Sequence, residues 1–79
     1  MTHKMNISII KELVKDANDC YADGRITILY DNKSIEIHFN DRRISGTFIK
    51  DFAAAASAFS WIFGIYPDDE NGNLYIRIN

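Results

Sequence analysis

The sequence predicts an α+β fold, with two helices packed on one face of a mostly antiparallel sheet. The chain has 79 residues, which suits a single domain (1–79) with one hydrophobic core. Two segments carry apolar residues at helical spacing, and several short runs alternate apolar residues with their neighbours as strands do. The expected element order is α-β-β-(β)-α-β, which gives three or four strands.

The first helix is predicted over about residues 6–22, after a short mobile tail over residues 1–5. Asn6 or Ser8 can cap its start, because a short side-chain oxygen accepts hydrogen bonds from free backbone N–H groups. Gly24 is the expected stop, since glycine adopts the left-handed backbone at a helix end without a steric penalty. Its apolar side carries Ile9, Ile10, Leu13, Val14, Ala17, Cys20 and Tyr21.

Alternation with a period of two then predicts a β-hairpin, two strands joined by a polar turn at residues 31–33. A third strand is expected over residues 44–48, weakened by Gly46. The last strand is expected over residues 74–78, after the turn signal Asn71-Gly72. The predicted core of the domain comprises Ile26, Ile28, Ile35, Ile37, Phe39, Phe52, Phe59 and Ile76.

The second helix is predicted over about residues 48–63, with Gly64 as its stop and Pro67 preventing early resumption. It is apolar on both sides, and a helix that is apolar all round is normally buried all round. In the simpler interpretation, the first helix covers the side that faces away from the sheet. In the alternative, Trp61 and Ile62 stay exposed and anchor a partner, because Trp is enriched among residues that dominate interfaces. A two-fold homodimer would then use Ala54, Ala58, Trp61 and Ile62.

The overall charge and composition limit the partners that the chain can have. Eleven acidic residues against nine basic ones give a net charge of −2, which argues against a protein that coats nucleic acid by charge alone. The single cysteine cannot form an internal disulfide, and no apolar run approaches the ~20 residues that span a bilayer. With no signal-peptide pattern at the start, we expect a soluble, cytoplasmic protein without a membrane partner.

An acidic segment, Asp68, Asp69 and Glu70, follows Pro67 and lies close to Tyr66. Its spacing does not fit a calcium loop, because Pro67 would take the first ligand position. The segment either solvates a loop or meets Arg and Lys residues of a partner, where charge speeds encounter and selects the partner. The candidate partner-binding residues are Trp61, Ile62, Tyr66, Asp68, Asp69 and Glu70.

The outward face of the predicted sheet is an alternative binding surface. It mixes aromatic and basic residues, which suits single-stranded nucleic acid, although it lacks the RNP1 signature and carries Glu36 in its middle. The simpler interpretation is a solvated face with cross-strand pairs. The expected face comprises Arg25, Thr27, Leu29, Glu36, His38, Arg43, Ser45, Tyr75 and Arg77. Of these, the candidate nucleic-acid-binding residues are Arg25, His38, Arg43, Tyr75 and Arg77.

Catalysis has the least support in the sequence. It contains no Gly-rich phosphate loop, no nucleophile elbow and no metal-ligand spacing, so we expect no enzyme, no metal and no cofactor. Cys20 lies on the apolar side of the first helix, where a free cysteine behaves as a small hydrophobe. A Cys20–His38 pair is a third alternative, and nothing in the sequence positions it.

In size, acidic charge, element order and its lone cysteine, the chain resembles the small phage-encoded proteins that inhibit host machinery, including anti-CRISPR proteins. The resemblance is one of type and carries no shared motif. It implies a non-catalytic protein that occludes a site on a larger protein or complex, often one that handles nucleic acid, in the cytoplasm of a bacterial host. The acidic segment suits such a partner if the partner presents a basic surface.

Overall fold

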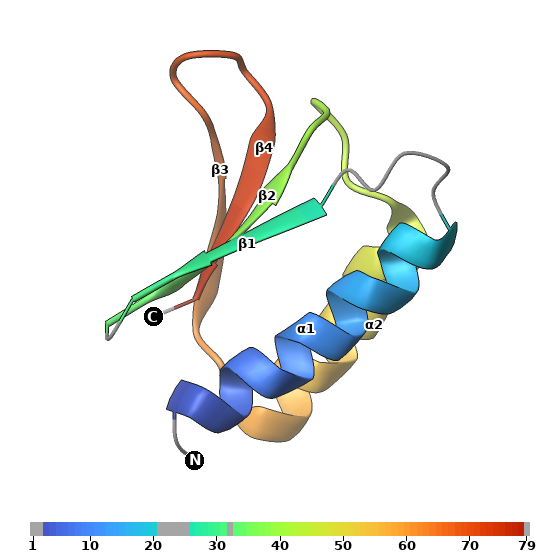
Figure 1. The fold of residues 1–79 in the computed structure, drawn as a ribbon, viewed down its shortest axis with the longest axis vertical. Helices are drawn as coiled ribbons and strands as arrows, with labels where there is room; N and C mark the ends of the chain where they lie inside the picture. The colour runs from blue at the N-terminus through green and yellow to red at the C-terminus, as the bar shows by residue number, and fades with distance from the viewer. Residues whose placement is uncertain (1–2, 21–25, 32, 79) are drawn as a thin grey trace.

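The computed structural model describes residues 3–20, 26–31 and 33–78. Within them, two helices and four strands follow the order α-β-β-α-β-β (Figure 1). Their bounds are α1 His3–Cys20, β1 Ile26–Tyr30, β2 Ile35–Phe39, α2 Gly46–Phe59, β3 Phe63–Pro67 and β4 Leu74–Ile78. The predicted α+β class is confirmed. No helix in this part of the chain is both long and apolar enough to cross a membrane.

The four strands form one antiparallel sheet in the order β1-β2-β4-β3, and both helices lie on the same face of it (Figure 1). Directly paired residues point to the same face of the sheet. The register therefore places their side chains in rows that run across the strands. Three rows face the helices: a short one pairs Ile26 with Phe39, and two cross all four strands. Of these two, one consists of Ile28, Ile37, Ile76 and Ile65, and the other of Tyr30, Ile35, Ile78 and Phe63.

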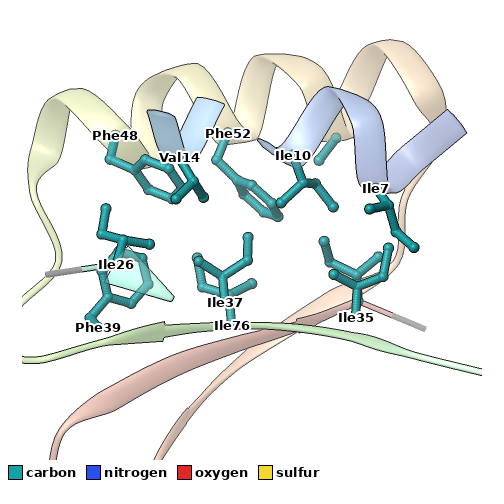
Figure 2. Close-up of a cluster of buried hydrophobic side chains, with 12 residues drawn as sticks. Ile7, Ile10, Val14, Ile26, Ile35, Ile37, Phe39, Phe48, Phe52 and Ile76 are labelled. Carbon is teal, nitrogen blue, oxygen red and sulfur yellow. The ribbon is translucent and has the colours of Figure 1, made fainter. Parts of the chain in front are cut away.

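The core fills the space between the helices and these rows (Figure 2). From the helices it takes Ile7, Ile10, Val14, Phe48, Phe52 and Ala56, and from the strands Ile26, Ile35, Ile37, Phe39, Ile76 and Ile78. Phe52 is fully buried, and its ring meets that of Phe63 edge to face, with centroids 4.9 Å apart. Six of the eight predicted core residues are therefore buried. The other two, Ile28 and Phe59, are only partly buried.

The structure corrects the predicted ends of the first helix. α1 begins at His3, so residues 3–5 are helical rather than part of a tail. Lys4 and Met5 are good helix formers, and no glycine or proline interrupts the segment. The predicted end at residue 22 and the stop at Gly24 lie outside the described residues, as do residues 1–2 of the expected tail.

The strand predicted over residues 44–48 is wrong. Ser45 is the N-cap of α2, and the N–H of Ile49 donates to the Ser45 carbonyl at 3.0 Å, which begins the helix there. The predicted stop of this helix at Gly64 is also wrong, because α2 ends at Phe59. Ser60 adopts the left-handed backbone (φ 58°, ψ 39°), and the N–H of Trp61 returns to the Ala56 carbonyl at 2.9 Å.

The early end of α2 leaves room for a strand that the sequence analysis missed. Gly64 and Pro67 both belong to β3, the edge strand beside β4. Gly64 pairs with Arg77, and Pro67 pairs with Leu74 at the end of the ladder. A proline is tolerated there because an edge strand needs no N–H on its outer side.

Candidate functional site

The face of the sheet opposite the helices is open (Figure 1). The strand register places two rows of side chains across it. The first row is aromatic over three strands and consists of Thr27, His38, Tyr75 and Tyr66. The second row carries charge in its middle and consists of Leu29, Glu36, Arg77 and Gly64. We call this surface the open face.

The aromatic row is a continuous stack of rings from β2, β4 and β3. His38 and Tyr75 are almost parallel, with ring centroids 4.9 Å apart and planes 6° apart. Tyr75 and Tyr66 follow at 5.6 Å with an angle of 35°. Tyr66 is 45% exposed, so the stack is accessible at its β3 end.

Gly64 leaves space for the Tyr66 ring on the open face, because it has no side chain. A Cβ atom at position 64 would lie 2.7 Å from Cζ of the Tyr66 ring and would collide with its hydroxyl. The ring therefore lies across the bare backbone of Gly64 and along the sheet. A glycine in a strand often marks such a close approach.

Glu36 links the two rows of the open face. Its Oε1 atom lies 2.8 Å from Nε2 of His38, and its Oε2 atom lies 4.0 Å from Nη1 of Arg77. The Glu36 and His38 side chains are each 27% exposed, so these contacts contribute little to stability, about 0–1 kcal/mol for a surface pair. Their main effect is on geometry and charge, because Glu36 orients the His38 ring and offsets the charge of Arg77.

The acidic segment forms a well-defined turn between β3 and β4. The Asp68 N–H donates to the Asn73 carbonyl at 2.7 Å, and the Gly72 N–H donates to the Asp68 carbonyl at 2.8 Å. Oδ1 of Asp68 also accepts from the Glu70 N–H at 2.8 Å. Gly72 has φ of 74°, which favours glycine. The turn predicted from Asn71-Gly72 is confirmed.

The acidic turn and the aromatic row meet in one shallow, open groove of about 390 Å³. The groove is lined by Glu36, His38, Pro67, Asp68, Asp69, Glu70 and Tyr75. Four carboxylates thus surround the exposed side of two stacked rings. This combination suits a positively charged group, which is attracted both to carboxylates and to the face of an aromatic ring.

The residues predicted to bind a partner fall into two separate places. Tyr66, Asp68, Asp69 and Glu70 lie together, at the end of β3 that leads into the turn. Ile62 precedes the opposite end of the strand and is 73% exposed, as expected for an anchor. Trp61 is not a free anchor, because its ring packs against Phe52 and Phe59, each at 5.7 Å between centroids.

The predicted nucleic-acid face is only partly assembled. His38, Tyr75 and Arg77 share the open face, but Arg43 lies in the bend before α2, because the strand expected there does not form. Ser45 leaves the face for the same reason. Arg25 lies outside the described residues. Arg77 is the basic member that the structure places on the face, and it lies next to Glu36.

Two further observations concern chemistry. Within the described residues, no group of three or more His, Cys, Asp and Glu side chains is arranged to hold a metal ion. Cys20 is the last residue of α1, but its side chain lies outside the described part, so the Cys20–His38 pair stays untested.

The place of Tyr66 in the aromatic row could not be predicted from the sequence, because it depends on β3, which was not predicted. Glu36 and His38 could be found, since residues two apart on a strand share a face.

Comparison with protein-family models, with curated proteins and with solved structures gives no match to this chain. What the protein binds therefore has to follow from the chemistry of its own surfaces.

Proposed function

We propose that the protein is a non-catalytic binding module that inhibits or regulates a larger protein by covering a basic surface of it. The observation that carries this proposal is the groove in which the acidic turn borders the His38–Tyr75 stack. Formal charges on and beside the open face are negative at Glu36, Asp68, Asp69 and Glu70. They are positive at Arg77 and at Arg42, whose guanidinium lies beside Gly72 of the turn.

The chemistry of the groove favours arginine and lysine side chains. Carboxylates accept charge-assisted hydrogen bonds, which are about twice as strong as neutral ones. A guanidinium or ammonium group over the face of a tyrosine gains a further ~0.5–1 kcal/mol at an exposed site. Tyr66 is 45% exposed and offers such a face beside the acidic turn, whereas Tyr75 is stacked between His38 and Tyr66. A basic segment lying across the groove would meet both kinds of contact.

The kind of partner follows from the resemblance to small phage inhibitors. Proteins that handle nucleic acid carry basic patches, because they must neutralise phosphates. An acidic surface that covers such a patch would block it stoichiometrically without any chemical step. The opposite charges would also raise the association rate and make it sensitive to salt.

Binding of single-stranded nucleic acid through the open face is the second candidate. The aromatic row favours it, because bases stack on exposed aromatic rings. The charges oppose it, because the acidic turn borders that row and would repel phosphates. We therefore place it second.

A binding titration distinguishes the two candidates. The probes are a peptide rich in Arg and Lys, a peptide of equal length without basic residues, and a single-stranded oligonucleotide, each at low and moderate salt. We expect the basic peptide to bind and added salt to weaken it, because salt screens exposed charges. Tighter binding of the oligonucleotide than of the basic peptide would overturn the proposal in favour of the second candidate.

Two matched triple variants show whether the acidic turn is responsible. One combines Asp68→Asn, Asp69→Asn and Glu70→Gln. The control combines Glu12→Gln, Asp16→Asn and Asp19→Asn, three exposed positions on α1, beyond the other face of the sheet. Both remove three negative charges, but we expect only the first to weaken peptide binding, by about tenfold or more. Equal losses in both variants would mean that net charge alone attracts the peptide.

A further inference from the structure

The rest of the fold covers the β1 edge of the sheet and leaves the β3 edge uncovered. At the β1 edge, the Asn18 side chain on α1 bonds to the main chain of Ile26 in both directions, donating to its carbonyl and accepting from its N–H, each at 3.1 Å. Asn18 thus takes the place of a neighbouring strand. On the same edge, Nζ of Lys11 lies 5.3 Å from the centre of the Tyr30 ring. The helix therefore guards this edge against pairing with another chain.

The β3 edge has no such guard among the described residues, since no side chain bonds to its outer side. Four of the six large hydrophobic side chains that are exposed in the described part of the chain lie at positions 62–66: Ile62, Phe63, Ile65 and Tyr66. The sequence from Phe52 to Pro67 contains no charged residue. Natural edge strands usually carry charges that prevent pairing, so this strand has the features of an interface.

The hydrogen-bonding groups of β3 can be assigned to its two sides. The Asp68 N–H donates to the Asn73 carbonyl, and the bonding pattern of an antiparallel ladder alternates from there. Gly64 and Tyr66 therefore direct their main-chain groups toward β4. Phe63, Ile65 and Pro67 direct theirs outward, which suits Pro67 because it has no N–H.

We propose that two copies of the chain pair along β3, antiparallel and about a two-fold axis at Ile65, to form one continuous sheet. In this register Ile65 faces Ile65 of the second copy, and their outward N–H and C=O groups can bond to each other. The Phe63 N–H can donate to the Pro67 carbonyl of the second copy. Tyr66 faces Gly64 of the second copy, which has no side chain to obstruct the ring.

The self-complementary register of β3 favours a second copy, and charge favours the antiparallel direction over the parallel one. Each chain carries a net charge of −2, so two copies approach most easily along an uncharged strip. Antiparallel pairing places the two acidic turns at opposite ends of the joined strands. Parallel pairing would bring six carboxylates, three from each Asp68–Glu70 segment, to the same end. A stable dimer buries about 800 Å² of accessible surface on each partner. This is about one seventh of the 5360 Å² of accessible surface of this chain.

This interface differs from the homodimer expected from the sequence. It keeps Ile62, which flanks the paired strand, but Trp61 is packed against the core, and Ala54 and Ala58 offer only small side chains. The pairing does not rest on the proposed partner binding, because it uses the outward main-chain groups of β3 and shares only Pro67 with the groove.

Sedimentation equilibrium over a range of concentrations, combined with amide hydrogen exchange, tests the dimer. We expect a reversible monomer–dimer equilibrium, in which Ile65→Lys raises the dissociation constant about tenfold or more, because it places like charges opposite each other. The control is Leu29→Lys, which changes a side chain of similar exposure on the guarded β1 edge and should leave the equilibrium unchanged. The circular dichroism of both variants reports whether they fold.

Hydrogen exchange of the unmodified protein tests the same interface without any substitution. The Phe63 and Ile65 amides should exchange more slowly as the concentration rises, while the amides of β1 should not change. A protein that stays monomeric at millimolar concentration would overturn the proposal. So would a dimer that is insensitive to Ile65→Lys and leaves the Ile65 amide unprotected.

Discussion

At the scale of single residues, Gly64 and Ser60 show how the backbone shapes the open face and ends a helix. Gly64 lets the Tyr66 ring lie along the sheet, and Ser60 ends α2 in the left-handed region. Neither role depends on contacts made by a side chain at the position itself. In both cases a substitution that adds or removes a Cβ atom is informative.

Gly64→Ala should displace the Tyr66 ring with little effect on stability. The added Cβ collides with the far end of a flexible side chain, which can rotate away, and alanine also lowers the entropy of the unfolded chain. We expect a change of less than about 1 kcal/mol in the free energy of unfolding. NMR should show the loss of ring-current shifts between Tyr66 and Tyr75. An unchanged Tyr66 spectrum would contradict the close approach.

Ser60→Gly should stabilise the protein by about 0.5–1 kcal/mol, because glycine adopts a positive φ without the steric cost that a Cβ atom imposes. Ser57→Gly is the matched control, since Ser57 is exposed within the same helix. It should destabilise by a few tenths to about 1 kcal/mol, because glycine is a poor helix former. Urea unfolding of the two variants checks both signs, and a destabilised Ser60→Gly would show that α2 ends differently.

At the scale of elements, the core depends on Phe52 more than on Phe59. Phe52→Ala should cost about 3–5 kcal/mol, which is much of the stability of a domain this small. Phe59 is only partly buried and stacks on Trp61, so Phe59→Ala should cost clearly less. Unfolding of both variants in urea gives the two losses of stability to be compared. Equal losses would place Phe59 in the core, where the sequence analysis expected it.

The Asn18 contact with Ile26 gives a second prediction at this scale. Asn18→Ala leaves the N–H and C=O groups of Ile26 without their side-chain partner, and we expect a cost of about 1–2 kcal/mol. Asn18→Asp keeps an acceptor for the N–H but cannot donate to the carbonyl, so its effect should be intermediate at most. Faster exchange of the Ile26 amide in Asn18→Ala would support this assignment. Unchanged exchange would contradict it.

The elements also show what a sequence can and cannot predict. β1, β2 and β4 were predictable, because alternating isoleucines mark a sheet with one buried face. β3 was not, since its residues are apolar on both faces and include Gly64 and Pro67, which normally signal a stop or a turn. The acidic turn was predicted from local residues. The groove could not be, because it requires Tyr75 and His38 to meet through the pairing of β2 with β4.

At the scale of the whole molecule, the helices occupy one face of the sheet and leave the aromatic row and the acidic turn together on the other side. The residues that stabilise the fold are therefore separate from the residues that carry the proposed function. Replacing Asp68, Asp69 and Glu70 by serine should change the free energy of unfolding by less than about 1 kcal/mol. Asp69 and Glu70 are exposed, and a serine hydroxyl at position 68 can still accept from the N–H of residue 70. A larger loss of stability in thermal unfolding would show that the turn supports the fold.

Chemical-shift mapping tests the central claim, that the open face binds a basic segment, most directly. Isotope-labelled protein is titrated at low salt with a peptide rich in Arg and Lys, and the perturbed amides and aromatic rings are located on the structure. We predict that the perturbations concentrate at His38, Tyr66, Tyr75 and the 68–70 turn and that they diminish with added salt. Perturbations confined to the helices, or none at all, would contradict the account.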